Sequence, residues 1–445
     1  MQRTMSSPLR AGSARTVGLF ALLVLLQVGF LQALTGIAKG DPFSFVVALA
    51  AGGPMVGLVL FLFPGQALLI APLLILLPVR LMFLQAFEFV FMAAILVYGL
   101  RYLATHSIDV RLRGIDVAFL LYLVWGLFSI TQAESTRIAI LGMTPAILFF
   151  FAFWAGSRIL GLARMPTLMR VYAWITIGIA LETLGVGLAH GVSVLHLFGQ
   201  LGKYTDVGWG RSNYIAAVAA LTTAAVLPGA FQWRGKDRAL AIAALVAAVF
   251  VALATASRGG TVALLLSVIL GLTIRRLNVL LTLSLAGAVA AFMFFSSFGQ
   301  AHFLGPKGLP SIGARFLFFR EAIRIALSHP VAGVGPDQIP YHTYFYMDAH
   351  PHNIFLKQAT DMGFVGLGLY LLLLGLVARH LVLLQRQRTR GAAAYLQFAV
   401  LGLVFLTALT NASYEPTLEE PQYGFLFWLM VGTLTPVPRE ETGPA

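Results

Sequence analysis

Long apolar runs separated by short polar segments make up most of this chain of 445 residues. About 20 predominantly apolar residues in a helix cross the hydrocarbon core of a bilayer, and fourteen segments approach that length. Two adjacent pairs, 43–62 with 64–79 and 239–256 with 260–274, have short members, so either pair can be a broken or re-entrant element. We therefore predict an all-α polytopic membrane protein with about twelve, and up to fourteen, transmembrane helices. The segments are 17–35, 43–62, 64–79, 83–103, 114–131, 139–160, 168–188, 213–231, 239–256, 260–274, 277–298, 362–384, 394–411 and 422–436.

The composition agrees with a membrane protein and argues against nucleic-acid binding. Hydrophobic residues account for 59% of the chain and charged residues for 11%, whereas soluble domains carry about 25% charged residues. The formal net charge is +13, but the basic residues form short clusters between apolar runs, as topology signals do. No long basic stretch interleaved with aromatic residues occurs, so we expect no nucleic-acid partner.

The basic clusters also indicate the orientation of the chain. If the N-terminus lies in the cytoplasm and the segments alternate, most Arg and Lys residues fall in cytoplasmic loops, as the positive-inside rule requires. An even number of spans then places both termini in the cytoplasm. We expect residues 1–445 to form a single membrane domain whose long loop 299–352 lies on the opposite side. The cytoplasmic clusters contain Arg101, Arg111, Arg113, Arg158, Arg164, Arg170, Arg234, Lys236, Arg238, Arg275, Arg276, Arg379, Arg386, Arg388, Arg390 and Arg439.

Besides the basic residues of the long loop 299–352, Lys39 and four arginines break this bias because they fall on the outer side: Arg80, Arg137, Arg211 and Arg258. Arg258 interrupts an apolar stretch, where a charge is costly unless it is paired or faces water. Arg211 opens a span after a polar loop. Guanidinium groups bind diphosphate in a bidentate manner, so these arginines are candidate ligands of a diphosphate. The alternative is that each is an ordinary arginine whose head reaches the interface.

The long outer loop is expected to contain a helix at the membrane interface. Residues 314–328 have a mostly apolar circumference and include three arginines, Arg315, Arg320 and Arg324. Arg320 and Arg324 are four residues apart and therefore share one face of a helix. The segment 329–336, with two prolines and two glycines, ends this helix in a turn.

The strongest local signal stands at the end of that loop, where His350 and His352 precede the span at 362–384. An imidazole has an unperturbed pKa of about 6.5 and can act as a general base near neutral pH. The alternative is that both are polar residues ending a loop. Gly363, Gly366 and Gly368 follow, and we expect them to allow close helix packing rather than to contact a substrate.

The outer acidic residues are candidate partners for these histidines and arginines. Glu415, Glu419 and Glu420 form the acidic patch of the segment 411–420, and are either solvated loop charges or partners of an arginine or of the catalytic histidine. No D-D or D-x-D pair occurs that would hold a divalent metal beside a diphosphate, and the chain has no cysteine. We therefore expect no metal and no cofactor.

At these residues the sequence resembles the O-antigen ligase family, which also includes O-antigen polymerases and bacterial protein O-oligosaccharyltransferases. The family motif is matched by His352-Asn353, nine residues, Gly363, two residues and Gly366. The preceding long outer loop is similar as well, as is its R-x-x-x-x-R phrase starting at Arg315. Arg258 within Ser-Arg-Gly, and Arg211 followed four positions later by Ile where the family has Leu, resemble the outer arginines of the family.

The resemblance implies a specific reaction. Such ligases transfer a polysaccharide from undecaprenyl diphosphate to a sugar hydroxyl of lipid A-core, in the outer leaflet of the bacterial inner membrane, without nucleotide or metal. Their fold is similar to that of C-type membrane glycosyltransferases. His352 would then be the general base, Arg211 and Arg258 would hold the diphosphate, and His350 and Arg80 would be secondary.

Three other functions stay open at this point. A polymerase or a protein O-oligosaccharyltransferase would use the same donor and the same residues. A flippase or transporter would perform no chemistry, but transporters often contain inverted repeats and mid-membrane breaks. We find no internal repeat, and the polar residues gather at the outer ends of the spans, so a transporter is the less favoured alternative.

Overall fold

The computed structural model describes residues 64–77, 80–81, 84–105, 112–190, 207, 210–255, 257–273, 308–343 and 350–437. The chain divides into two compact units. The first comprises Met1–Ala67 and Ala93–Thr105, and its described part is mainly the second half of the helix α4 (Ala86–Thr105). The second comprises Leu68–Met92 and His106–Ala445 and holds all the candidate residues.

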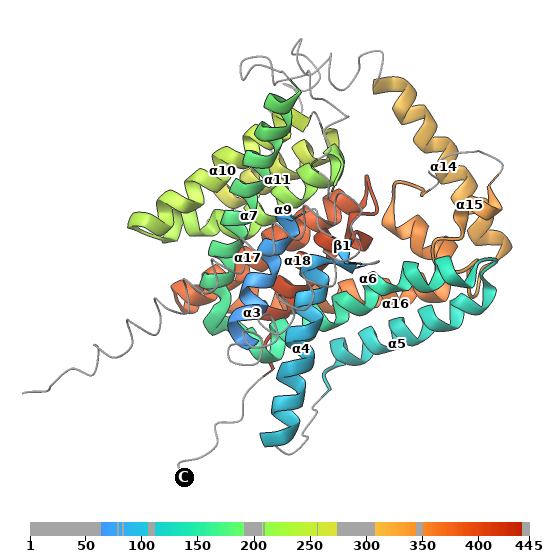
Figure 1. Ribbon diagram of the computed structural model, residues 1–445, viewed down its shortest axis with the longest axis horizontal. Helices are drawn as coiled ribbons and strands as arrows, with labels where there is room; N and C mark the ends of the chain where they lie inside the picture. The colour runs from blue at the N-terminus through green and yellow to red at the C-terminus, as the bar shows by residue number, and fades with distance from the viewer. Residues whose placement is uncertain are drawn as a thin grey trace, which may run out of the picture. The chain divides into compact units, whose positions relative to one another are not determined.

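The described residues are almost entirely helical (Figure 1). Two strands of two residues each, β1 (Arg80–Leu81) and β2 (Leu84–Gln85), pair antiparallel. The longer helices are α4, α5 (Gly114–Ser129), α6 (Thr136–Ala155), α7 (Gly161–Ala189), α9 (Ser212–Gln232), α10 (Gly235–Thr255), α11 (Arg258–Thr273), α14 (Gly308–Ser328), α16 (Ile354–Gln387), α17 (Ala392–Ala412) and α18 (Pro421–Leu434). The shorter ones are α3 (Pro64–Ile70), η1 (Ala71–Leu76), η2 (Ile130–Gln132), the π-turn η3 (Gly156–Leu160), α15 (Ile339–His342), η7 (Arg388–Arg390) and η8 (Thr417–Glu419).

Six helical stretches among the described residues are long and apolar enough to cross a membrane. The stretch from Thr136 to Ala189 has 54 residues, far more than one crossing needs, and it breaks at Gly161, whose φ is 59°. The prediction of an all-α polytopic membrane protein is confirmed. The predicted spans 17–35, 43–62 and 277–298 lie outside the described residues, so the total of twelve to fourteen stays a prediction.

The helix α9 runs through the interior of the second unit. It packs against α7, α10, α11 and α17 (Figure 1), and nearly every residue from Ile215 to Ala230 is buried. Its small side chains, mostly Ala and Thr, allow this close packing. The helix α18 is buried along its whole length, with Trp428 and Phe425 in contact with aromatic rings of α5, α6 and α4. Arg211 directly precedes α9, and Glu419 and Glu420 directly precede α18.

Two helices differ from their predicted bounds. The helix in the outer loop was predicted at 314–328 and begins earlier, at Gly308. The span predicted at 362–384 begins at Ile354, directly after the His-Asn pair, and its first two turns contain Lys357 and Asp361. The predicted span left out these two polar residues, but both are buried in the structure, where they form an ion pair at 2.5 Å.

The helix α16 is interrupted at Gly363, which has φ 69° and ψ −174°. A side chain at this position would collide with the carbonyl oxygen of Val331, so the glycine permits both the left-handed backbone and the close approach. The turn 329–336 seals the break: its Val334 and Gly335 N–H groups donate to the carbonyls of Thr360 and Asp361, each at 2.9 Å. The interruption therefore anchors the outer loop to α16.

Gly363→Ala should destabilise the protein by at least about 1–3 kcal/mol, because it adds strain at a left-handed position and a collision with Val331. The matched control is Gly368→Ala, where an added Cβ meets nothing within 4 Å and helix propensity favours alanine by about 1 kcal/mol. Thermal unfolding of the purified variants in detergent measures both. Equal unfolding temperatures for the two variants would contradict the role assigned to Gly363.

Candidate active site

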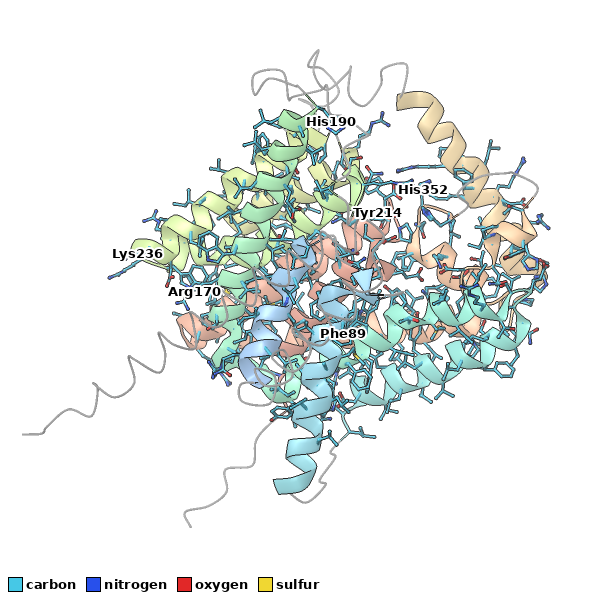
Figure 2. All side chains as sticks on the ribbon, viewed as in Figure 1. Phe89, Arg170, His190, Tyr214, Lys236 and His352 are labelled. Carbon is cyan, nitrogen blue, oxygen red and sulfur yellow. The ribbon has the colours of Figure 1, made fainter. Side chains whose placement is uncertain are left out.

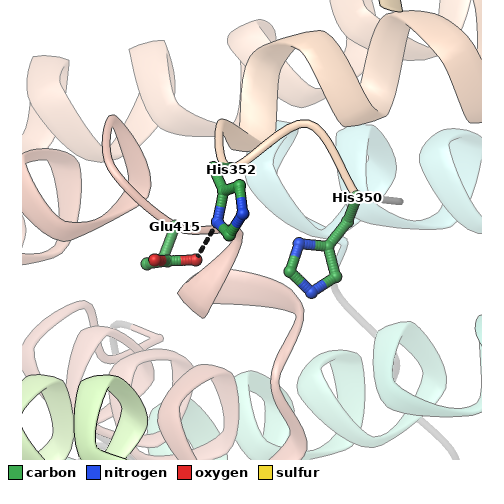
Figure 3. Close-up of side chains that lie close together, drawn as sticks. All are labelled: His350, His352 and Glu415. Atoms are coloured by element: carbon green, nitrogen blue, oxygen red, sulfur yellow. Dashed lines mark hydrogen bonds and ion pairs between the residues drawn. The ribbon is translucent and has the colours of Figure 1, made fainter. Parts of the chain in front are cut away.

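His352 lies immediately before α16 in an uncommon backbone conformation. Its φ is 48°, and a non-glycine residue in the left-handed region is a point of local strain that often marks a functional position. The next residue, Asn353, caps the helix because its side chain accepts a hydrogen bond from the Leu356 N–H at 3.0 Å. The cap fixes the start of the helix, and the imidazole of His352 turns toward the loop between α17 and α18 (Figure 3).

The ring of His352 is paired with the carboxylate of Glu415. Its Nδ1 is 2.6 Å from Oε2 of Glu415, whose side chain is only 8% exposed, whereas that of His352 is 24% exposed. A carboxylate only accepts hydrogen bonds, so the imidazole donates through Nδ1–H and keeps Nε2 free to accept a proton. This is the arrangement in which a carboxylate orients a histidine base and stabilises its protonated form.

Glu415 is held in turn by residues from two other helices. Its Oε1 accepts from Nη2 of Arg315, on α14, and from Nδ2 of Asn213, in the first turn of α9, both at 2.9 Å. Its own N–H donates to the carbonyl of Asn411 at the end of α17. The pair of His352 and Glu415 thus depends on four segments that are far apart in the sequence.

Arg258 and Arg315 flank this carboxylate. Arg258 opens α11 and lies within electrostatic range of Arg315. A Cβ added at the adjacent Gly259 would be 3.5 Å from Cβ of Tyr414, the residue before Glu415. Arg211 caps α9 and is exposed, two residues from Asn213. Arg315 therefore contacts the His352–Glu415 pair directly, Arg258 lies near Arg315, and Arg211 precedes the helix that carries Asn213.

The remaining candidate arginines belong to α6, α14 and β1. Arg137 is exposed in the first turn of α6. Arg320 is exposed on α14, and Arg324 pairs with Glu321 at 2.6 Å and donates to the carbonyl of His342. The backbone of Arg80 belongs to β1, whose hairpin adjoins α18 through a hydrogen bond from Gln422 to Gln85.

His350 packs against His352, with ring centroids 5.0 Å apart and planes at 83° (Figure 3). Its Nδ1 is buried and has no hydrogen-bond partner among the residues that the structure describes. Burial, together with the nearby His352, lowers the pKa of His350 below its usual 6.5. His350 is therefore neutral at neutral pH.

Glu419 and Glu420 are placed differently from Glu415. Glu419 pairs with Lys357 at 2.9 Å rather than with an arginine or histidine, and burial raises its pKa to about 7. Burial also raises the pKa of Glu420 to about 6, against the opposing hydrogen bond from Tyr214 of α9. Figure 2 labels Tyr214 in the first turn of α9 and His352 before the start of α16.

Sequence reasoning missed Asn213, Tyr214 and Lys357. Asn213 and Tyr214 follow Arg211 at the start of an apolar span, where polar residues are common and carry little signal. Lys357 and Asp361 are four apart, a spacing that brings side chains together on a helix, but the predicted span began at residue 362, after both of them.

His350, His352 and Glu415 also offer three ligand atoms within 4.8 Å of one another, a set that suits a metal ion. Ligands of a tetrahedral zinc ion lie about 2.0–2.1 Å from it and hence roughly 3.3 Å from one another. The 2.6 Å between His352 and Glu415 is instead a hydrogen-bond distance, and the other oxygen of Glu415 is engaged by Arg315 and Asn213. The geometry fits a shared proton better than a metal.

The comparisons with known proteins point to one family. No curated protein sequence matches the chain. Residues 243–371 match the family model described as O-antigen ligase, a segment that includes Arg258, Arg315, His352 and Gly363, while Asn213 and Glu415 fall outside it. The match supports the family resemblance: residues 243–371 are similar to the O-antigen ligase family, and the chain that carries them is a multi-pass membrane protein.

Proposed function

We propose that this protein transfers O-antigen polysaccharide from undecaprenyl diphosphate to a sugar hydroxyl of lipid A-core, at the outer face of the bacterial inner membrane and without a metal. The observation that carries the proposal is the His352–Glu415 pair with Arg258 and Arg315 beside it. Displacement of a diphosphate by a hydroxyl requires a base that takes the hydroxyl proton and cationic groups that stabilise the charge of the leaving diphosphate.

The reaction is a direct displacement at the anomeric carbon. Nε2 of His352 takes the proton of the acceptor hydroxyl while the acceptor oxygen forms its bond to the sugar. The bond between that sugar and the diphosphate breaks, and the diphosphate leaves with the electron pair. Glu415 positions the ring through Nδ1 and stabilises the imidazolium that forms.

The arginines stabilise the charge that grows on the leaving diphosphate. Arg258 and Arg315 lie closest to the pair, and Arg211 stands at the neighbouring helix end. Charge interactions are stronger at a partly buried site than in bulk water, so this stabilisation is a large part of the catalytic effect. Arg80 and Arg137 are secondary candidates for the rest of the donor, and His350 for packing of the base.

Purified protein given donor and lipid A-core in EDTA should release undecaprenyl diphosphate and form the lipid A-core conjugate. The readout is mass spectrometry of both products. Activity lost in EDTA and restored by Mg²⁺, Mn²⁺ or Zn²⁺ would contradict the metal-free mechanism. A product in which polymer grows on undecaprenyl diphosphate would identify a polymerase, and glycosylated protein in cells would identify a protein O-oligosaccharyltransferase.

His352→Ala should reduce the transfer rate by about 10²–10⁴-fold, the usual worth of a general base. Glu415→Gln should also reduce the rate, because the amide does not stabilise the imidazolium, while the apparent affinity for donor changes little. His350→Ala should be milder. The matched control is His190→Ala, an exposed histidine whose ring contacts only the Val186 carbonyl of its own helix. Wild-type transfer by His352→Ala at equal membrane levels would exclude it as the base.

The proposed orientation has a direct test, because the chain contains no cysteine. Glu134→Cys, exposed in the loop after α5, should react with an impermeant maleimide in intact spheroplasts. Arg390→Cys, exposed at the opposite end of α16 in η7, should react only after permeabilisation. The reverse pattern would place His352 on the cytoplasmic side and overturn the proposed function.

A further inference from the structure

The ammonium group of Lys357 forms ion pairs with three carboxylates near the candidate active site. Its Nζ lies 2.7 Å from Asp337, 2.5 Å from Asp361 and 2.9 Å from Glu419. These residues come from the loop after α14, from α16 itself and from η8, and together with Lys357 they form what we call the Lys357 cluster. The side chains of Lys357 and Asp361 are 10% and 4% exposed. All three donors of the ammonium are therefore committed.

The charges of this cluster do not balance. One ammonium faces three carboxyl groups, so full ionisation would leave two uncompensated negative charges. Asp337 is 48% exposed and solvated by water, whereas Asp361 and Glu419 are only 4% and 25% exposed. A buried unpaired charge is costly, and a carboxyl group in that position binds a proton instead. Among the residues that the structure describes, the other groups that face the cluster supply no further cation. They are Tyr122 of α5, Tyr370 of α16, Gln358 of α16, Glu420 after η8, and His350, which burial keeps neutral.

A cavity adjoins the cluster, and two polar atoms that line it lack partners. Asp361 Oδ1 and the Tyr370 hydroxyl are buried and make no hydrogen bond to any residue that the structure describes. The cavity, between α5, α6, α16 and α18, has a volume of about 30 Å³. A water molecule needs about 10–15 Å³ measured in this way, so the cavity has room for one or two waters that would satisfy both atoms.

We propose that the Lys357 cluster is a proton-binding site, which holds one exchangeable proton on its carboxyl groups at neutral pH and reaches it through water in the adjoining cavity. The proton supplies part of the positive charge that the cluster lacks. Glu419 is the carboxyl group that mainly binds this proton, because Lys357 forms shorter ion pairs with Asp337 and Asp361 than with Glu419. In agreement, burial raises the pKa of Glu419 to about 7, whereas the charge of Lys357 lowers the pKa of Asp337.

The site is coupled to the active site through one loop. Glu419 and Glu415 lie four residues apart between α17 and α18. Tyr122 donates a hydrogen bond to Gln358, and Gln358 donates one to Glu419. These hydrogen bonds connect α5 and α16 to the loop that carries Glu415.

The sign of the stability effect follows from the pKa of Glu419, which is about 7 in the folded protein and 4.5 for the free group. The folded state binds the proton more tightly, so its contribution to stability is full at acid pH and is lost as pH rises through about 7. Glu419→Gln keeps a neutral side chain of the same shape and removes this dependence.

The test compares wild type, Glu419→Gln and the control Glu134→Gln, whose carboxylate is exposed and outside the cluster. Relative to Glu419→Gln, the unfolding temperatures of wild type and Glu134→Gln should fall as pH rises from about 5 to about 8. Infrared spectra should show a protonated carboxyl that titrates in that window and is absent in Glu419→Gln. Both readouts need no donor or acceptor, so they stand apart from the transferase proposal.

Three results would overturn the proposal. The first is a wild-type infrared spectrum without a protonated carboxyl that titrates in this window. The second is the same titrating carboxyl signal in Glu419→Gln as in wild type, which would show that Glu419 does not hold the proton. Stabilisation by Na⁺ over choline at equal ionic strength, lost in Glu419→Gln, would show that a metal cation supplies the missing charge instead.

Discussion

The buried carboxylate of Glu415 dictates how the outer end of the protein is assembled. A buried charge must be paired and hydrogen-bonded, or it destabilises the fold by several kcal/mol. Glu415 meets this requirement with Arg315, Asn213 and His352, which belong to α14, to α9 and to the residue pair that opens α16. The same interactions that neutralise the carboxylate bring the imidazole and the arginines together. The site and the local fold are therefore one network, and loss of one member leaves the others as unpaired buried groups.

The break in α16 makes this network geometrically possible. An uninterrupted helix would hydrogen-bond its own Thr360 and Asp361 carbonyls and leave the outer loop without a fixed attachment. Because Gly363 interrupts the helix, these carbonyls accept from the turn 329–336 instead, and Ser129 of α5 donates to the Asp361 carbonyl as well. The loop that begins with α14 is thus anchored within three turns of His352, and Arg315 reaches Glu415 from a defined direction. The glycine spacing of the family motif has its physical cause here.

The sequence predicted the helical membrane architecture, because hydropathy and charge asymmetry are properties of single segments. It also identified His352, Arg258 and the acidic segment 411–420 individually, because polar and charged residues at the ends of apolar segments are costly unless they are paired or functional. The pairing of His352 with Glu415 rather than Glu419, and the contribution of Asn213, depend on contacts between segments up to 202 residues apart, and no local pattern encodes them. Lys357 and Asp361 were missed because charged residues are usually exposed. Here the two form an ion pair with each other, and this pairing permits their burial. The roles of the site residues stay predictions.

The charge balance of the site suggests an order of events in the proposed reaction. His352 gains a positive charge when it takes the proton, and it does so close to Arg315 and Arg258, whose charges oppose that gain. Glu415 offsets one of the positive charges that surround the ring. A bound diphosphate brings negative charge to the arginines and removes this penalty. Proton transfer to His352 is therefore easier when the donor is present than when it is absent, and this coupling favours attack by an activated hydroxyl only on a donor already in place. A site built from a base and a carboxylate without arginines would lack that dependence.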